Sequence, residues 1–283
     1  MLEDKQENLS LKKFYAHNPF PKFDISDENK FSKYCNDFSW YYKVFPKNLI
    51  DNASSLSLLD CGCGTGENSC MFASRGYKVT AFDLSPASIK IAKQNAKNLG
   101  FKVDFYEGDV TNFNLNRKFD IVFCMGVLMY PKHPEVAFDN LAKFVKPGGL
   151  LIAGVYNKYG SYLSRIKTRK KLNRLYGTNL ERKINHIIKE NPEIKKLPNY
   201  RELILDGIEV PRENFFTSGQ IMAYFQKNNF EICLSSPPLG ITDIIKMRKN
   251  SYGKRSGMNI LCSQLLWLIL KKDFHMVSGI KKY

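Results

Sequence analysis

A short apolar strand that runs directly into a glycine-rich loop constrains the fold of this chain more than any other feature. The stretch "LLDCGCGTGENSC" places three glycines, Gly62, Gly64 and Gly66, between an apolar run and a helical pattern. Glycines at such a turn let the backbone bend sharply and approach a ligand, and the following helix presents free N–H donors. The sequence therefore predicts a ligand site at the end of this strand.

Apolar runs and helical patterns alternate from Ser57 onward, which is typical of a parallel sheet with crossover helices. The expected strands are 56–61, 78–83, 103–109, 119–126, 150–156, 230–235 and 274–280. The expected helices are 67–74, 86–99, 135–144 and 218–228. We therefore expect an α/β fold, with a doubly wound, mostly parallel sheet that carries helices on both faces.

Two segments do not fit this repeat. The first 50 residues contain the aromatic, helix-like stretch "FSKYCNDFSWYYKVF", and residues 157–217 form a long excursion after the fifth strand. Between Ser161 and Tyr200 this insertion has eleven Lys or Arg and only three Glu. Long insertions at the carboxyl ends of strands surround the ligand site in such folds, so we expect this one to contribute to function.

The totals restrict the class of protein. The chain has 283 residues, 43% of them hydrophobic, and a formal net charge of +16. This charge would suit a phosphate-bearing partner or an anionic membrane, but a solvated basic surface explains it equally well. Seven scattered cysteines and a polar start without a secretory leader predict a cytoplasmic protein without disulfides. The longest apolar run, within "NILCSQLLWLILKK", is too short for a membrane span. We expect residues 246–272 to form a buried helix.

The residues around the glycine loop indicate which ligand it holds. A dinucleotide site favours G-x-G-x-x-G, whereas here position 67 is a glutamate that would face a bound pyrophosphate. Asp60 at the strand end would instead favour the ammonium and sulfonium charges of S-adenosylmethionine. Asp83 ends the next strand, where it can accept hydrogen bonds from a ribose diol, although it could simply cap a helix. Asp109 ends the third strand and can accept from an adenine amino group, with the backbone of Val110 beside it.

The three cysteines near the loop, Cys61, Cys63 and Cys70, raise the alternative of a metal site. No second C-x-x-C or Cys-His pair accompanies them, so we interpret them as small buried apolar residues and expect no metal.

In order and spacing, five segments resemble the successive motifs of class I S-adenosylmethionine-dependent methyltransferases across residues 57–157. They are "LLDCGCGTGENS", "VTAFDLSPASI", "VDFYEGDV", "FDIVFCMGVLMY" and "LAKFVKPGGLLIAGVYN". The resemblance implies a seven-stranded Rossmann-like sheet whose last strand, "FHMVSGIKK", is antiparallel, with S-adenosylmethionine as cofactor. The cofactor-binding residues it implies are Asp60, Gly62, Gly64, Gly66, Asp83, Leu84, Asp109, Val110, Cys124, Met125 and Gly126.

A second set of segments, "VYNKYG" and "HNPFPKFD", is similar to a group of bacterial methyltransferases of mostly unassigned substrate. This resemblance implies that residues 1–50 form a helical cap or lid on a methyltransferase domain, residues 51–283. Within that domain, residues 157–217 would be an inserted lid that recognises the acceptor. The candidate catalytic residues after the fourth strand are His133 and Tyr130, and the candidate substrate-binding residues are Tyr156, Asn157 and Tyr159. For each, a surface histidine or a packed tyrosine is the ordinary alternative.

The acceptor is narrowed by two motifs that the sequence does not contain. The Asn/Asp-Pro-Pro-aromatic motif of amino-methylating nucleic-acid enzymes is replaced by "GVLMYPKHPE", and no cysteine follows a proline as in cytosine C5 enzymes. We therefore expect methyl transfer to an O or N atom of a small metabolite or biosynthetic intermediate, and the basic insertion would suit an anionic one. RNA is the alternative, with tyrosines stacking among the basic residues. A non-catalytic cofactor-binding protein is a third alternative, and a dehydrogenase is disfavoured by Glu67.

Overall fold

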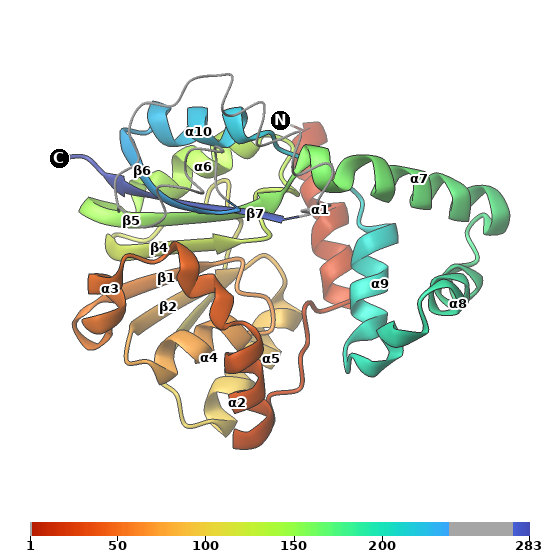
Figure 1. The fold of residues 1–283 in the computed structure, drawn as a ribbon, viewed down its shortest axis with the longest axis horizontal. Coiled ribbons are helices and arrows are strands. Elements are labelled where there is room, and N and C mark those ends of the chain that lie inside the picture. Colours follow the sequence, from red (N-terminus) through yellow and green to blue (C-terminus); the bar gives the residue numbers. More distant parts are fainter. Residues whose placement is uncertain (1, 238–273) are drawn as a thin grey trace.

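A seven-stranded sheet in the order β3-β2-β1-β4-β5-β7-β6 forms the centre of the molecule in this computed structural model (Figure 1). The structure describes residues 2–237 and 274–283. The strands are β1 (Ser57–Cys61), β2 (Lys78–Asp83), β3 (Asp104–Glu107), β4 (Phe119–Met125), β5 (Val145–Tyr156), β6 (Phe230–Ser236) and β7 (Phe274–Lys281). Strands β1 to β5 pair in parallel, whereas β7 pairs antiparallel to both β5 and β6. The predicted α/β fold and its antiparallel last strand are confirmed.

Successive side chains of the central strands point to opposite faces of the sheet, and helices bury both faces. Leu58, Phe123 and Ile152 belong to the core beneath α4 (Glu67–Ser74) and α5 (Pro86–Asn98). Leu59, Val122 and Leu151 belong to the core beneath α6 (Pro134–Lys143) and α10 (Ser218–Lys227). The near-continuous apolar runs of the sequence are therefore explained by burial on both sides.

Helix starts lie where local sequence signals predict them. Ser85 accepts a hydrogen bond from the Ser88 backbone N–H at 3.2 Å and so caps α5. Thr217 and Gln220 form a reciprocal capping box at the start of α10. Strand β5 begins at Val145, earlier than the predicted residue 150, because Val145 pairs with Phe119 ahead of a register shift in the β4–β5 ladder.

The N-terminal segment divides into two parts. Helix α2 (Glu28–Asp37) and the 3-10 turn η1 (Ser39–Val44) pack their aromatic side chains onto the sheet, with the Tyr41 ring 5.6 Å from that of Phe123. Two short elements, α3 (Lys47–Asp51) and η2 (Ala53–Ser55), then lead into β1. Helix α1 (Leu2–His17) lies instead between the sheet and the helical insertion (Figure 1).

The insertion after β5 is a helical unit with its own small core. It contains α7 (Lys158–Tyr176), α8 (Leu180–Glu190), the 3-10 turn η3 (Pro192–Lys196) and α9 (Tyr200–Glu209). The buried residues of its core are Leu172, Ile184, Ile204, Leu205 and Ile208. The helix expected within residues 246–272 lies outside the described residues. In the described ranges, no helix is both long and apolar enough to span a bilayer.

Candidate functional site

A cavity of about 340 Å³ lies at the carboxyl ends of the parallel strands, between the glycine loop, α1 and the insertion. This is the edge of the sheet at which ligands bind in open α/β folds. Apolar and aromatic side chains dominate its wall. They include Leu11, Tyr15, Phe20, Phe23, Tyr34, Phe38, Tyr41, Phe82, Met129, Tyr130, Tyr156, Leu203 and Phe274.

Hydrogen bonds to the end of β2 fix the position of the glycine loop beside this cavity. The Gly62 N–H donates to the Phe82 carbonyl at 2.8 Å, and the Gly64 N–H donates to an Asp83 carboxylate oxygen at 2.9 Å. The second Asp83 oxygen accepts from the Ser85 N–H at 2.8 Å. A Cβ on Gly62 would lie 2.2 Å from a methyl carbon of Val127, so only glycine fits at this position.

All charged side chains among the described residues lining the cavity are carboxylates, namely Glu67, Asp83 and Asp109. Burial raises the pKa of Asp83, and it raises the pKa of Glu67 to about 7. Because buried carboxylates are stabilised by a nearby cation, this end of the cavity suits a positively charged ligand and opposes a pyrophosphate.

Eight of the eleven residues expected at the cofactor line this cavity, and three do not. Those that line it are Gly62, Gly64, Asp83, Leu84, Asp109, Val110, Met125 and Gly126. Asp60 instead points into the face covered by α4, where it accepts a hydrogen bond from Ser69 at 2.6 Å. Gly66 packs closely against α5, where a Cβ on it would lie 2.7 Å from the Cβ of Ala92. Cys124 is fully buried in the core.

The loop between α1 and α2, residues 18–27, is attached to the glycine loop by backbone hydrogen bonds. The Thr65 N–H donates to the Phe20 carbonyl at 3.2 Å, and the Lys22 N–H donates to the Thr65 hydroxyl at 2.8 Å. The Phe23 N–H donates to the Glu67 carboxylate at 2.7 Å. Glu67, the residue that argued against a dinucleotide in the sequence, therefore anchors this loop.

The same α1–α2 loop is attached to the insertion on its other side. The Asn199 side-chain amide donates to the Pro21 carbonyl at 2.6 Å, and the Lys22 ammonium lies 3.2 Å from the Glu202 carboxylate. Both Asn199 and Glu202 lie at the start of α9. The α1–α2 loop thus bridges the two sides of the cavity.

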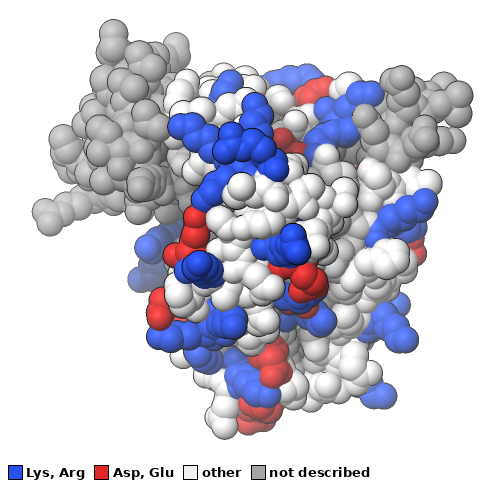
Figure 2. Space-filling model, turned by 90° about the vertical axis from the view of Figure 1, so that its right-hand side faces the viewer, with Lys and Arg blue, Asp and Glu red and all other residues white. Residues whose placement is uncertain are grey.

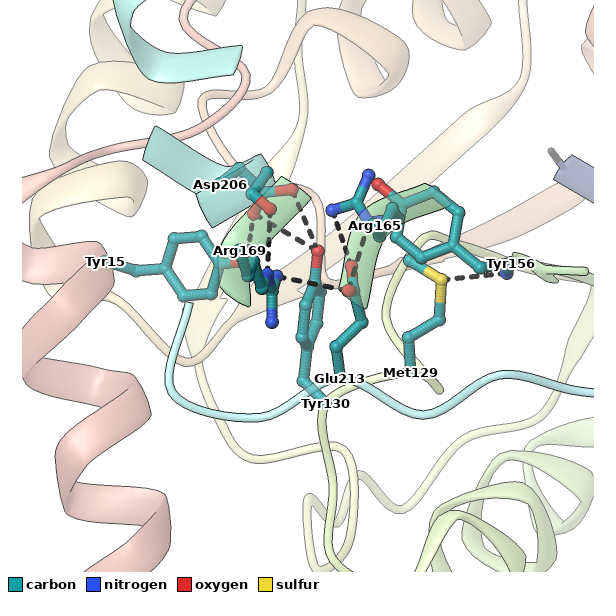
Figure 3. A network of polar contacts seen from close by, with 9 residues as sticks. Tyr15, Met129, Tyr130, Tyr156, Arg165, Arg169, Asp206 and Glu213 are labelled. Atoms are coloured by element: carbon teal, nitrogen blue, oxygen red, sulfur yellow. Dashed lines mark hydrogen bonds and ion pairs between the residues drawn. The ribbon is translucent and has the colours of Figure 1, made fainter. Parts of the chain in front are cut away.

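A buried carboxylate, Asp206, meets two tyrosine hydroxyls behind the opposite wall of the cavity (Figure 3). The Tyr15 hydroxyl donates to Asp206 Oδ1 at 2.7 Å, and the Tyr130 hydroxyl lies 3.2 and 3.3 Å from its two oxygens. The two tyrosines line the cavity, whereas Asp206 on α9 does not. Burial raises the pKa of Asp206, and the hydrogen bond from Tyr15 opposes that rise.

Two arginines of α7 and one glutamate complete this polar network. Glu213 lies 2.6 Å from Arg165 and 3.1 Å from Arg169, and its side chain is 1% exposed. The Arg165 guanidinium also lies 4.3 Å from the centre of the Tyr156 ring. With Asp206 ionised, the two arginines and two carboxylates balance, so the network remains close to neutral inside the protein.

The residues predicted on the acceptor side are divided by the structure. Tyr130 and Tyr156 line the cavity. His133 does not line it: its side chain is 52% exposed and lies 3.3 Å from Glu135 at the start of α6. Neither Asn157 nor Tyr159 lines the cavity, because the Asn157 side chain caps α7 by accepting from the Tyr159 N–H at 2.9 Å.

Sequence reasoning did not identify Tyr15 and Asp206, which are 191 positions apart in the chain. Asp206 had one signal in the sequence, since it is the carboxylate in "LILDGI", between apolar residues that form the core of the insertion. The cysteine interpretation is confirmed, as Cys61, Cys63 and Cys70 are buried. No group of three or more His, Cys, Asp or Glu able to hold a metal lies in the described part of the chain.

Comparison with known proteins shows that part of the chain resembles methyltransferases. A model described as a methyltransferase domain matches residues 59–153. The ubiquinone biosynthesis O-methyltransferase of Rickettsia conorii is 29% identical over 112 residues, which are 40% of this chain and 39% of that protein. The mitochondrial enzyme of the same name from Schizosaccharomyces pombe is 35% identical over 118 residues, 41% of this chain and 42% of that protein. The matched stretch spans about two fifths of these curated relatives.

Solved structures resemble the chain over more of its length. PKMT2 from Rickettsia typhi has a TM-score of 0.60 at 18% identity, with 94% of this chain and 56% of that one covered. Magnesium protoporphyrin IX methyltransferase from Synechocystis, solved with bound SAH, has a TM-score of 0.52 at 16% identity. The match covers 89% of this chain and 83% of that one. The fold is therefore shared with methyltransferases well beyond the matched residues.

Proposed function

We propose that this chain is a class I S-adenosylmethionine-dependent methyltransferase and that it methylates an O or N atom of a small molecule. The observation that carries this proposal is the two-part cavity. One part has a glycine loop and three carboxylates, and the other has aromatic side chains that include Tyr15 and Tyr130, whose hydroxyls donate to Asp206. The first part suits a cationic cofactor and the second an apolar acceptor.

The residues present fit S-adenosylmethionine. We propose that Gly62 and Gly64 bring the backbone against its methionine moiety, that Asp83 accepts from its ribose, and that Asp109 and Val110 contact its adenine. Leu84, Met125 and Gly126 would complete this part of the wall. When bound, the cofactor supplies an activated methyl group. The protein's contribution is then to hold an acceptor in line and to exclude water.

The acceptor that this wall favours is a small, largely apolar molecule. Tyr15, Met129, Tyr156, Leu203 and Phe274 present few polar atoms, and no Lys, Arg or His lies among the described lining residues. This composition supports a neutral acceptor over the anionic one that the total charge suggested. An oxygen atom is supported by the curated relatives, which are named as O-methyltransferases.

We further propose that α1, the α1–α2 loop and the insertion together form a lid over the acceptor. This proposal keeps residues 1–50 as a cap and residues 157–217 as a recognition segment within the domain 51–283. It is supported by the attachment of the α1–α2 loop to both Thr65 and Asn199. A lid of this kind would exclude water from the reacting atoms.

The RNA alternative has weaker support. Five of the eleven basic residues between Ser161 and Tyr200 pair with carboxylates, namely Arg165, Arg169, Lys171, Lys183 and Lys196. None of the eleven lines the cavity. Figure 2 shows red carboxylates and uncharged surface among the blue side chains on the face that carries α7 and α8. An RNA substrate would require these charges to converge on the cavity.

A cytoplasmic location remains a proposal as well. It is supported by the cysteines, because the six in the described residues are all free thiols. Such use of cysteine is typical of a reducing compartment.

The experiment that tests the function is transfer of radiolabelled methyl groups from S-adenosylmethionine into host extract, separated into small molecules, RNA and protein. We expect label in the small-molecule fraction with the wild-type protein and little or none with Asp83→Ala. Label in RNA would favour the RNA alternative. If S-adenosylhomocysteine binds but no fraction is labelled, the non-catalytic alternative gains support.

A further inference from the structure

The two tyrosine hydroxyls at the acceptor end of the cavity have a fixed hydrogen-bond direction. Asp206 is 4% exposed and accepts from both hydroxyls, and the nearby Arg165 and Arg169 favour its ionised form, which can only accept hydrogen bonds. Tyr15 and Tyr130 therefore direct their hydroxyl protons toward Asp206, away from the cavity that their rings line. A hydroxyl whose proton is donated to Asp206 keeps only the lone pairs of its oxygen. Each tyrosine can therefore accept a hydrogen bond from a ligand but cannot donate one.

We propose that the acceptor of this protein is a hydroxyl compound whose O–H donates to Tyr130, and that Asp206 receives the proton through that tyrosine. The proposal rests on the proposed methyl transfer. When the new O–CH3 bond forms, the S–CH3 bond breaks and its electron pair stays on sulfur. The acceptor proton passes to the Tyr130 oxygen as the Tyr130 proton passes to Asp206. The positive charge of the sulfonium and the negative charge of Asp206 disappear together.

The surroundings of Asp206 suit a proton acceptor. The groups that face it are Tyr15 from α1, Tyr130 after β4, Tyr156 from β5, Arg165 and Arg169 from α7, and Glu213 after α9. Burial makes Asp206 a stronger base than an exposed carboxylate. Burial also raises the pKa of Tyr130 and Tyr15 far above the ordinary value, so the tyrosines pass a proton on without becoming ionised themselves. Asp206 is thus a positioning residue that acts through Tyr130.

The first test compares Asp206→Asn, Tyr130→Phe and Tyr15→Phe with the wild type in the radiolabel assay on the small-molecule fraction. Asp206→Asn should lower kcat by about 10² to 10⁴-fold, as expected for loss of a general base. It should also remove the acid limb of the pH–rate profile, while S-adenosylhomocysteine binding stays close to wild type. Asp104→Asn, an exposed change on β3, is the matched control. Wild-type kcat and pH profile in Asp206→Asn would overturn the proposal.

The second test does not depend on turnover. It measures binding of phenol and of anisole, its O-methyl derivative, to the protein saturated with S-adenosylhomocysteine. The wild type should prefer phenol by roughly fivefold to tenfold, the size of one net hydrogen bond, and Tyr15→Phe/Tyr130→Phe should lose that preference. Equal binding of the two probes by the wild type would overturn the proposal.

The two tests distinguish failure of the proposed methyl transfer from failure of the proposed role of the tyrosines. If the wild type transfers no methyl group, the proposed function fails, and the preference between phenol and anisole still decides whether the tyrosines accept from a hydroxyl. If Asp206→Asn does not fold, the two phenylalanine variants decide, because each deletes only a hydroxyl.

Discussion

The carbonyl oxygen of Phe20 lies where a side chain on Gly64 would begin, 2.1 Å from the position of its Cβ. Gly64 also has a φ of +54°, a conformation that L-residues with side chains avoid. The glycine loop and the α1–α2 loop are therefore fitted to each other, although Phe20 and Gly64 are far apart in the sequence. Any side chain at position 64 must displace the α1–α2 loop.

Gly64→Ala is expected to weaken S-adenosylhomocysteine binding at least tenfold and to lower the melting temperature, because the methyl group displaces Phe20. Isothermal titration calorimetry and thermal unfolding measure the two effects. Gly100→Ala is the matched control, since Gly100 has a φ of +72° but nothing within 4 Å of its Cβ position. If the two variants behave alike, backbone strain alone accounts for the loss and the fit to Phe20 is irrelevant.

Glu67→Ala is expected to loosen the α1–α2 loop. It leaves the half-buried Phe23 N–H without its acceptor, a loss that costs on the order of 1 kcal/mol. Limited trypsin digestion followed by mass spectrometry should show faster cleavage after Lys22 than in the wild type. Glu193→Ala, at an exposed position, should leave cleavage unchanged. Unaltered cleavage at Lys22 in Glu67→Ala would contradict the anchoring role.

The contribution of two buried carboxyls, Asp60 and Glu67, to the free energy of unfolding should fall as the pH rises from about 4.5 to about 7. Burial raises the pKa of both Asp60 and Glu67 to about 7, so the folded chain keeps protons that the unfolded chain has already released. Stability decreases with pH wherever the folded state binds more protons. At about 1.4 kcal/mol per pKa unit, each carboxyl accounts for a loss on the order of 3 kcal/mol.

Urea unfolding across this pH range checks the dependence. Glu67→Gln cannot titrate and should flatten the decrease, and Asp60→Asn should do the same. Variants with the wild-type slope would show that these carboxyls are already ionised in the folded protein at pH 5.

Charge reversal on the exposed face of α7 should not alter methyl transfer. Lys167→Glu and Lys170→Glu change exposed residues that do not line the cavity. Transfer into the small-molecule fraction should stay within about twofold of wild type, the effect expected of surface substitutions. A large loss of label, in particular from the RNA fraction, would instead support a nucleic-acid substrate.

Much of the fold was predictable because its signals are local. The β2 strand Lys78–Asp83 and the α4 helix Glu67–Ser74 begin and end where the pattern predicts, since burial on both faces requires apolar runs and Gly66 marks the start of the helix. The early start of β5 was missed because "KPGG" resembles a turn, whereas Val145 there pairs with Phe119 ahead of a register shift. Local pattern does not reveal pairing across the sheet.

One side of the cavity wall was predictable for the same reason, since Gly62, Asp83 and Asp109 lie at or just after the ends of successive parallel strands. The acceptor side was not. Asp206 and Tyr15 meet only because the insertion and α1 pack together, a contact between segments 191 positions apart. His133 was a reasonable candidate by residue type, but its place at the start of α6 leaves it exposed.

A calorimetric titration with S-adenosylhomocysteine tests most directly whether this cavity holds the cofactor. Asp83→Asn is the test variant and Asp104→Asn the control. We expect one bound ligand per chain. Asp83→Asn should raise the Kd at least tenfold, whereas Asp104→Asn should leave it unchanged. Absence of binding by the wild type, or equal affinity in Asp83→Asn, would contradict the assignment of this cavity to the cofactor.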